Sequence, residues 1–159
     1  MFIFIALAAC AWLALLTLAP LVPAPLAAAL YAVGAQICHQ RPDRSFHLFA
    51  AQLPVCGRCL GLYAGAACGS MVALAASVRA RIASWSLRAL LIAASIPTAL
   101  TLVAEWSGVW GGSNAVRAAA ALPLGCAVAL VVAQAAATLH YGGCAPRRPI
   151  ASNRPPTPI

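Results

Sequence analysis

The sequence has no lysine and almost no acidic residues. Its ten basic residues are all arginine, two residues are acidic, and charged residues make up 8% of the 159 positions. A soluble domain carries roughly 25% charged residues, so this chain has too few to cover a water-facing surface. Hydrophobic residues account for 64% of the chain, and its mean hydropathy is +0.92. The composition excludes an ordinary soluble domain and predicts an integral membrane protein.

The formal net charge of +8 does not indicate a nucleic-acid-binding protein. The arginines are scattered at the ends of apolar runs, whereas a nucleic-acid site needs them gathered on one face. Arginines at the ends of apolar runs anchor membrane segments and set their orientation. We therefore expect the lipid bilayer, and no nucleic acid, as the surroundings of this chain.

Four apolar runs are long enough to cross the ~30 Å hydrocarbon core of a membrane as helices. They are residues 2–19, 60–78, 87–106 and 115–139. A shorter run, 26–37, predicts a half-helix after the prolines at positions 20, 23 and 25. A cleaved signal peptide is the alternative for the first run, although no basic residue precedes it. We predict an all-α polytopic membrane bundle of four transmembrane helices, followed by a disordered tail over 140–159 that is rich in proline and arginine.

A short interfacial helix is predicted between the half-helix and the second span, over residues 46–53. Phe46, Phe49 and Leu53 share one helical face at spacings of three and four, and Pro54 stops the helix. Such an apolar face would lie at the membrane surface or cover a site beneath it.

Glycine repeats at every fourth position of the second span, at Gly61, Gly65 and Gly69. Small residues at this spacing allow another helix to approach closely. The fourth span carries a similar face, made of Ala121, Gly125, Ala129, Ala133 and Ala137. We expect these faces to pack the second span against the fourth or its neighbours. Contact of these faces with a second copy of the chain or with another membrane protein is the alternative.

An even number of spans places both termini on one side of the membrane. Six arginines would lie on that side: Arg79, Arg81, Arg88, Arg147, Arg148 and Arg154. Four would lie on the other side: Arg41, Arg44, Arg58 and Arg117. Positive charge accumulates on the cytoplasmic side of membrane proteins. We therefore expect a multi-pass protein of the cell inner membrane, with cytoplasmic termini and the central polar segment facing outward.

Polar chemistry is concentrated in residues 38–63, which hold three of the seven cysteines. Cys56 and Cys59 form a Cys-x-x-Cys pair, and Cys38 and His39 precede it in the same segment. Zinc takes four ligands from thiolates and imidazoles, often two of them from such a pair. These four residues predict a metal site, with zinc as the favoured metal and His47 as a spare ligand.

Thiol–disulfide exchange is the second interpretation of the same residues. The Cys56–Cys59 pair stands at the start of the second span, where the helix dipole and Arg58 would stabilise a thiolate. Cys38 would then be the partner thiol. Four-helix membrane proteins with such a pair resemble thiol:quinone oxidoreductases, which implies a quinone as electron acceptor, although the 107–114 loop lacks the second cysteine pair of those enzymes. The third interpretation is a structural membrane subunit whose cysteines only pack or form a disulfide.

A polar shell is expected around the cysteines. It consists of Gln40, Arg44, Arg58, Tyr63, Glu105, Asn114 and Arg117. Glu105 is the most informative member, because an acid in a membrane span is costly and usually has a partner. Arg117, Arg44 or Arg58 would form a buried ion pair with it, and a solvated helix end is the alternative. Asn114 either caps the fourth span or joins the polar cluster.

Two linked motifs resemble a known family. The first is Cys38-His39-Gln40-x-Pro42-x-Arg44-Ser45-Phe46, and the second is Cys56-x-Arg58-Cys59-x-Gly61-x-Tyr63-x-Gly65. Together they resemble the signature of a family of small multi-pass prokaryotic membrane proteins, catalogued as a domain of unknown function. This chain departs from the family's pattern in the third span, where Glu105-Trp106 stands in place of an Asp-Gly pair. The resemblance implies a membrane protein with a polar cysteine–histidine site, and it implies no particular activity.

Overall fold

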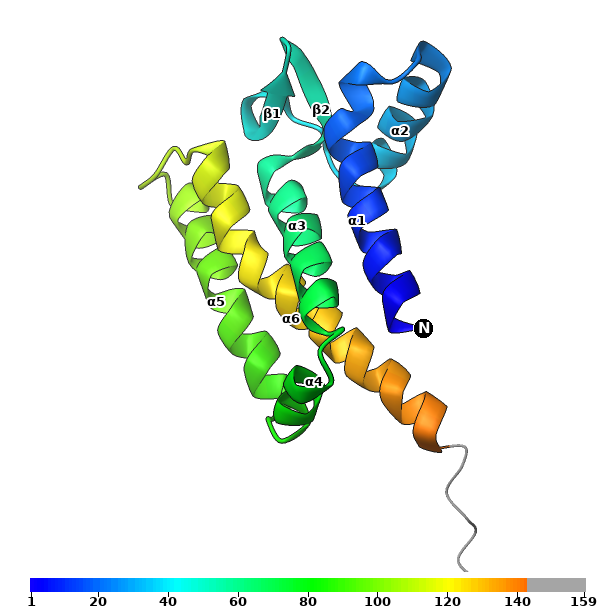
Figure 1. Cartoon of the computed structure of the whole chain (residues 1–159). Helices are drawn as coiled ribbons and strands as arrows, with labels where there is room; N and C mark the ends of the chain where they lie inside the picture. The colour runs from blue at the N-terminus through cyan, green and yellow to red at the C-terminus, as the bar shows by residue number, and fades with distance from the viewer. Residues whose placement is uncertain (143–159) are drawn as a thin grey trace, which may run out of the picture.

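Helices dominate the computed structural model, which describes residues 1–142 (Figure 1). The elements in chain order are α1 (Phe2–Leu18), the 3-10 turn η1 (Ala19–Leu21), α2 (Ala24–Ile37), the 3-10 turn η2 (Pro42–Arg44), β1 (Ser45–Leu48), β2 (Ala51–Cys56), α3 (Gly57–Val72), α4 (Ala76–Ala83), α5 (Leu87–Trp106) and α6 (Asn114–Gly142). Three helices, namely α1 extended by η1, α5 and α6, are long and apolar enough to cross a membrane, and α3 with α4 is a candidate for a fourth crossing. The predicted helical membrane bundle is confirmed.

Helices α3 and α6 lie against each other along their length and form the centre of the bundle (Figure 1). A Cβ atom added at Gly61 or Gly65 of α3 would collide with a backbone carbonyl oxygen of α6, and one added at Gly125 of α6 would collide with the carbonyl of Leu62. The small residues therefore bring the two backbones into contact, as the four-residue spacing predicts. Because α6 occupies the glycine face of α3, that face is not free to join a second copy of the chain.

The outer helices are fixed to this pair by aromatic and hydroxyl side chains. Trp12 of α1 meets Tyr63 of α3 edge to face, with ring centroids 6.0 Å apart. On the other side, Thr98 of α5 donates a hydrogen bond of 2.8 Å to the backbone carbonyl of Ala120 in α6. Helix α1 thus lies along α3, and α5 lies along α6 (Figure 1).

The second predicted span, 60–78, is wrong as a single helix. Helix α3 ends at Val72, and the chain bends by 109° into α4. Arg79 of α4 turns back and donates to the carbonyls of Ala73 and Leu74, the latter at 2.9 Å. These contacts satisfy carbonyl groups that a helix end leaves without partners. The same guanidinium lies 4.3 Å from the ring centroid of Phe2, so the start of α1 is held at this end of the bundle.

The predicted interfacial helix, 46–53, is also wrong, because these residues form a β-hairpin. Strands β1 and β2 are antiparallel, with His47 opposite Gln52 and an irregularity between Ser45 and His47. The two turn residues, Phe49 and Ala50, have φ angles of 50° and 63°. Positive φ at both central positions is the signature of a type I′ turn, one of the two common two-residue hairpin turns. Phe49 is 80% exposed at the hairpin tip, so it does not cover the site.

Helix α2 occupies Ala24–Ile37, where the sequence predicts a half-helix from residue 26. It begins immediately after Pro23 and leads the chain towards Cys38. Helix α6 continues to Gly142. The remainder of the predicted disordered tail, 143–159, lies outside the described residues.

Candidate functional site

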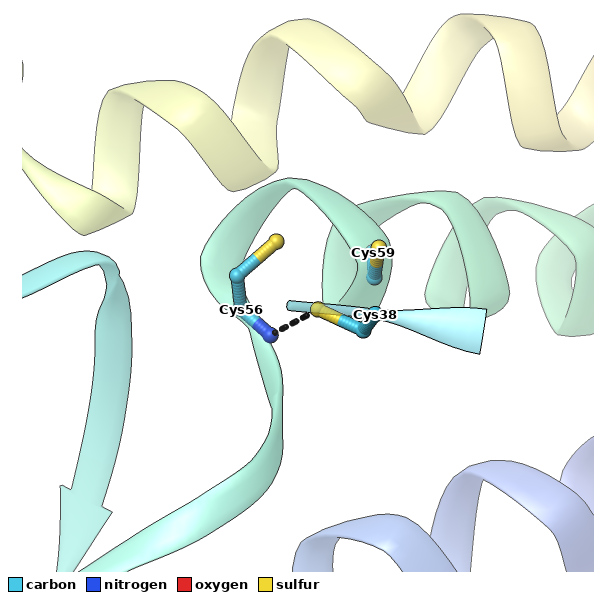
Figure 2. A group of neighbouring side chains, drawn as sticks. All are labelled: Cys38, Cys56 and Cys59. Carbon is cyan, nitrogen blue, oxygen red and sulfur yellow. Dashed lines mark hydrogen bonds between the residues drawn. The ribbon is translucent and has the colours of Figure 1, made fainter. Parts of the chain in front are cut away.

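Three sulfur atoms meet at the start of α3. The Sγ atoms of Cys38, Cys56 and Cys59 all lie within 4.8 Å of one another. Figure 2 shows the three side chains gathered around the first turn of α3, with Cys38 approaching from a separate segment. The backbone N–H of Cys56 donates a hydrogen bond of 3.2 Å to the Cys38 sulfur. Residues that are far apart in the sequence are therefore joined in one thiol cluster.

The local sequence explains why the pair and the single cysteine converge. Cys56 ends strand β2 and stands at the N-terminus of α3, and Cys59 follows within the first helical turn. A Cβ atom added at Gly57 would lie 2.8 Å from the carbonyl oxygen of Asn114, so glycine allows this turn to approach the start of α6. Cys38 comes directly after α2, which places its sulfur beside the same turn.

An apolar wall supports the sulfur cluster from behind. Leu16 of α1 and Val55 of β2 are fully buried, and they pack with Cys38, which is 8% exposed. Tyr63 and Trp12 extend this wall. The sulfurs therefore lie between a dry hydrocarbon surface on one side and a polar cavity on the other.

Two glutamine side chains hold the loop that carries Cys38. The Gln40 amide donates to the carbonyl of Tyr31 at 2.8 Å and to that of Pro54 at 2.9 Å. Gln52 donates to the carbonyl of Gln40 at 2.6 Å. Gln40 has a φ of 48°, an unusual conformation for a residue with a side chain, which these hydrogen bonds maintain. Gln40 thus positions the loop, and its amide is fully engaged with the backbone.

The thiol cluster favours one ionised sulfur. A hydrogen bond from the Cys59 side chain is the largest cause that lowers the pKa of Cys56, to about 5, and backbone N–H groups of α3 and the Cys38 thiol assist against the opposing effect of burial. Amides at a helix N-terminus stabilise negative charge in this way. These contacts hold the pKa of Cys56 well below that of an ordinary thiol.

The open side of the cluster is a cavity of about 350 Å³. Its lining consists of the three cysteines with Ile37, His39, Gln40, Arg41, Arg44, Arg58 and Arg117. Four of these residues are arginines, and no acidic side chain belongs to the part of the lining that the structure describes. The cavity is therefore strongly positive, apart from its sulfur floor.

One buried carboxylate organises the arginines. Glu105 at the end of α5 has a side chain that is 3% exposed, and its Oε1 accepts from Arg117 Nε at 2.6 Å. Arg58 lies 3.4 Å from the same oxygen, and Arg44 lies 3.5 Å from Oε2. Arg117 is further fixed by Asn114 Oδ1 at 2.8 Å and by the carbonyl of Gly111 at 3.0 Å. Asn114 in turn donates to the carbonyl of Ser45 at 2.9 Å, which links α6 to the hairpin.

Comparison with known proteins shows a family match over the part of the chain that holds these residues. Residues 38–131 match the family described as "Predicted membrane protein (DUF2085)". The chain belongs to the DUF2085 family. The match begins at Cys38 and includes the three cysteines, Glu105 and the arginines of the cavity. The family membership that the two linked motifs predict is confirmed.

Two archaeal relatives of this DUF2085 chain are themselves uncharacterised. An uncharacterised protein of Methanothermobacter thermautotrophicus is 33% identical over 95 residues, which cover 60% of this chain and 83% of the relative. An uncharacterised protein of Methanocaldococcus jannaschii is 49% identical over 43 residues, which cover 27% of this chain and only 28% of that relative. No solved structure matches this chain.

The structure of this DUF2085 member brings some of the predicted site residues together and leaves others apart. It brings Cys38, Cys56 and Cys59 together, whereas His39 is exposed at the cavity and does not belong to the described group of atoms within 4.8 Å. His47 is exposed on β1. Tyr63 supports the sulfurs through its ring, and Asn114 belongs to the arginine network.

Sequence reasoning missed three contributors to the site. Arg41 lines the cavity, but in the sequence it counts only as a topology-setting arginine. Leu16 supports Cys38 from the first span, where nothing distinguishes it from the other leucines. The third is Gly57, which the sequence could have indicated. A glycine between the two cysteines of a Cys-x-x-Cys motif allows another backbone segment to approach closely.

Proposed function

We propose that this membrane protein binds a thiophilic divalent metal ion, zinc favoured, through Cys38, Cys56 and Cys59. The single observation that carries this proposal is the convergence of three sulfurs within 4.8 Å. Tetrahedral zinc with Zn–S distances of about 2.3 Å requires sulfurs about 3.8 Å apart. The sulfurs would therefore have to approach one another by no more than about 1 Å to hold such an ion.

A fourth ligand of such an ion would come from the cavity, which the three cysteines line. His39 lies on the lining of the cavity and stays the predicted fourth ligand, which its imidazole would become by turning inward from its exposed position. Until it does so, the position is open to water or a solute, which is the arrangement that zinc sites use for chemistry. The metal would polarise whatever occupies that position.

The surrounding charges support a thiolate-rich metal site. A divalent ion with three thiolates carries a net charge of −1, and Arg58 and Arg44 lie on the same cavity. Positive side chains near thiolates keep them ionised and available as ligands. The low pKa of Cys56, about 5, has the same effect.

A thiol–disulfide enzyme is the second candidate, and the ionised Cys56 favours it. A thiolate beside two further thiols has the elements of an exchange reaction, in which Cys56 attacks a substrate disulfide and Cys59 or Cys38 resolves the mixed disulfide. Two electrons from the protein thiols then reduce the substrate disulfide, and the resulting protein disulfide needs a two-electron donor, such as a dithiol or a quinol, to complete the cycle. In the opposite direction, the protein disulfide oxidises a substrate dithiol, and the protein thiols pass the two electrons to a quinone.

We also propose an orientation in the inner membrane. The end that carries Arg79, Arg81 and Arg88 lies opposite the sulfur cluster along α3 and α5 (Figure 1). The positive-inside rule favours a cytoplasmic location for that end. The cluster and its cavity would then face outward, and the termini would be cytoplasmic.

Elemental analysis of the purified chain, beside a count of reactive thiols in denaturant, tests the metal proposal. Wild type is expected to carry about one equivalent of zinc, and Cys59→Ser is expected to lose it. Cys68→Ser is the matched control, because Cys68 lies on the same helix, is exposed and is remote from the cluster. Absence of metal, with two thiols that react only after a reductant is added, would favour the redox candidate instead.

A further inference from the structure

We propose that the cavity beside the sulfur cluster binds a phosphate-type oxyanion, held by Arg44 and Arg58, with Arg41 at its mouth. All three side chains line the same cavity of about 350 Å³. The proposal concerns a ligand other than the metal ion and does not depend on the metal.

The charges around the cavity do not balance without a ligand. Four arginines line it, and the acids paired with them are Asp43 and Glu105, which leaves an excess of two positive charges (4 − 2). Asp43 is 57% exposed at the outer edge, so it compensates the interior weakly. A dianion would neutralise this excess.

Two arginine donors beside the cavity lack a hydrogen-bond acceptor. Within residues 1–142, the Nε atoms of Arg44 and Arg58 are buried and have no hydrogen-bond partner, although Arg44 Nε lies 3.6 Å from Oδ2 of Asp43. Buried guanidinium N–H groups are nearly always hydrogen-bonded, so the Nε of Arg58 in particular indicates a missing acceptor. The neighbouring Glu105 Oε2 also accepts no hydrogen bond, and it is held by Arg44 at 3.5 Å through charge alone.

Arg117 differs from the other arginines of the cavity. Its Nε, Nη1 and Nη2 atoms already donate to Glu105, Asn114 and Gly111. Its side chain is 6% exposed, so it forms a fixed part of the wall. Arg117 therefore positions Glu105, which in turn holds Arg44 and Arg58 near the cavity, while the remaining donors of those two residues stay available.

The shape of the cavity suits a phosphate group better than a smaller anion. Guanidinium groups recognise phosphate oxygens through paired, charge-assisted hydrogen bonds. The volume equals that of about twelve water molecules at ~30 Å³ each, which leaves room for a small group attached to the phosphate. Ile37 on the lining is 46% exposed and offers an apolar edge. The shared ligand chemistry is therefore a phosphate, either of a soluble phosphate compound or of a lipid headgroup.

Direct binding measurements test this inference on the full chain after treatment with a chelator. Radiolabelled inorganic phosphate is titrated by equilibrium dialysis in a neutral detergent. In a second arm, phosphatidic acid is titrated into nanodiscs of phosphatidylcholine, and bound lipid is counted by native mass spectrometry. Arg58→Gln is expected to weaken binding about 10- to 100-fold, which is typical for the loss of a charge-assisted hydrogen bond. Arg88→Gln removes the same charge from an exposed position at the far end of the bundle and is expected to bind like wild type.

Each outcome of these titrations either supports or overturns the proposed binding of a phosphate group. Saturable binding of inorganic phosphate that Arg58→Gln weakens and Arg88→Gln preserves supports a soluble phosphate ligand. Binding of phosphatidic acid alone, with the same response to the variants, supports a lipid headgroup. No saturable binding in either arm, or equal effects of the two variants, overturns the inference. Arg44→Gln provides the second variant if Arg58→Gln does not fold. The Cys59→Ser variant is expected to keep the anion affinity, so failure of the metal proposal is distinguishable from failure of this one.

Discussion

Neutralising Glu105 is expected to destabilise the bundle more than any other change of a single charge. The Glu105→Gln variant keeps the size of the side chain and removes the buried carboxylate charge of the arginine cluster. Its carboxylate is 3% exposed and lies 2.6, 3.4 and 3.5 Å from Arg117, Arg58 and Arg44. The variant therefore leaves Arg117 and Arg58 without their carboxylate partner, and Arg44 with only the exposed Asp43 at 3.6 Å.

The magnitude follows from the burial of the cluster. An ion pair 4 Å apart is worth about 4 kcal/mol at an effective dielectric constant of 20. Removing one partner of a buried pair costs about 3–5 kcal/mol, because the other charge stays desolvated. The side chain of Arg117 is only 6% exposed, so water offers it little relief. We expect a loss of about 3–5 kcal/mol in the free energy of unfolding, or roughly two to four orders of magnitude in the unfolding equilibrium.

Equilibrium unfolding in mixed micelles with increasing SDS provides the assay, followed by the fluorescence of the four tryptophans. Asp43→Asn is the matched control, because Asp43 is the other acid of the chain and is 57% exposed. Surface ion pairs contribute little, so this variant is expected to unfold like wild type. The double variant Glu105→Gln/Arg58→Gln is expected to regain part of the loss. If Glu105→Gln and Asp43→Asn unfold at the same SDS fraction, the reasoning about the buried cluster is wrong.

Three further predictions concern packing, ionisation and loop geometry. Gly65→Leu is expected to abolish recovery of monodisperse protein in size-exclusion chromatography, because its side chain would enter the backbone of α6, whereas Gly111→Ala, with open space around it, is expected to be neutral. In metal-free protein, Cys56 has a pKa of about 5, so its reaction with iodoacetamide is expected to be nearly as fast at pH 6 as at pH 8 and to slow only around and below pH 5. Mass spectrometry measures the rate of modification at each pH. A rate that rises tenfold per pH unit up to pH 8 would indicate an ordinary thiol. Gln40→Ala leaves two carbonyls without their donor and is expected to lower the free energy of unfolding by about 1–3 kcal/mol, while exposed His47→Ala is expected to change it little.

The helices of the bundle were predictable because hydrophobic length is a direct physical requirement of a membrane span. The hairpin was not, because Phe46, Phe49 and Leu53 also have helical spacing and the turn uses Phe49 and Ala50 at positive φ instead of glycine or asparagine. The bend after Val72 was hidden for a similar reason. No proline or glycine lies at residues 73–75, and the bend is stabilised by Arg79, a contact between two helices that forms only after both exist.

The site was predictable to the extent that its chemistry is rare in the sequence. Cysteines beside a Cys-x-x-Cys pair and a lone glutamate in an apolar chain both indicate residues with partners. The sequence does not reveal which neighbour turns inward, so His39 could not be distinguished from Gln40, whose amide bridges α2 and β2. Nor does it reveal that one carboxylate is shared by three arginines, since that arrangement depends on how α3, α5 and α6 meet.

The separate origins of the three sulfurs have a mechanical consequence. Cys38 is carried by the α2 segment, whereas Cys56 and Cys59 are carried by α3, which is locked to α6 through its glycine face. A ligand that engages all three sulfurs therefore acts as a cross-link between the first part of the chain and the central helix pair, and it closes the segment 38–56 into a ring. Its binding free energy adds to the cohesion of the assembled bundle. A bound ligand thus makes it harder for the first helices to separate from α3, and loss of the ligand makes it easier.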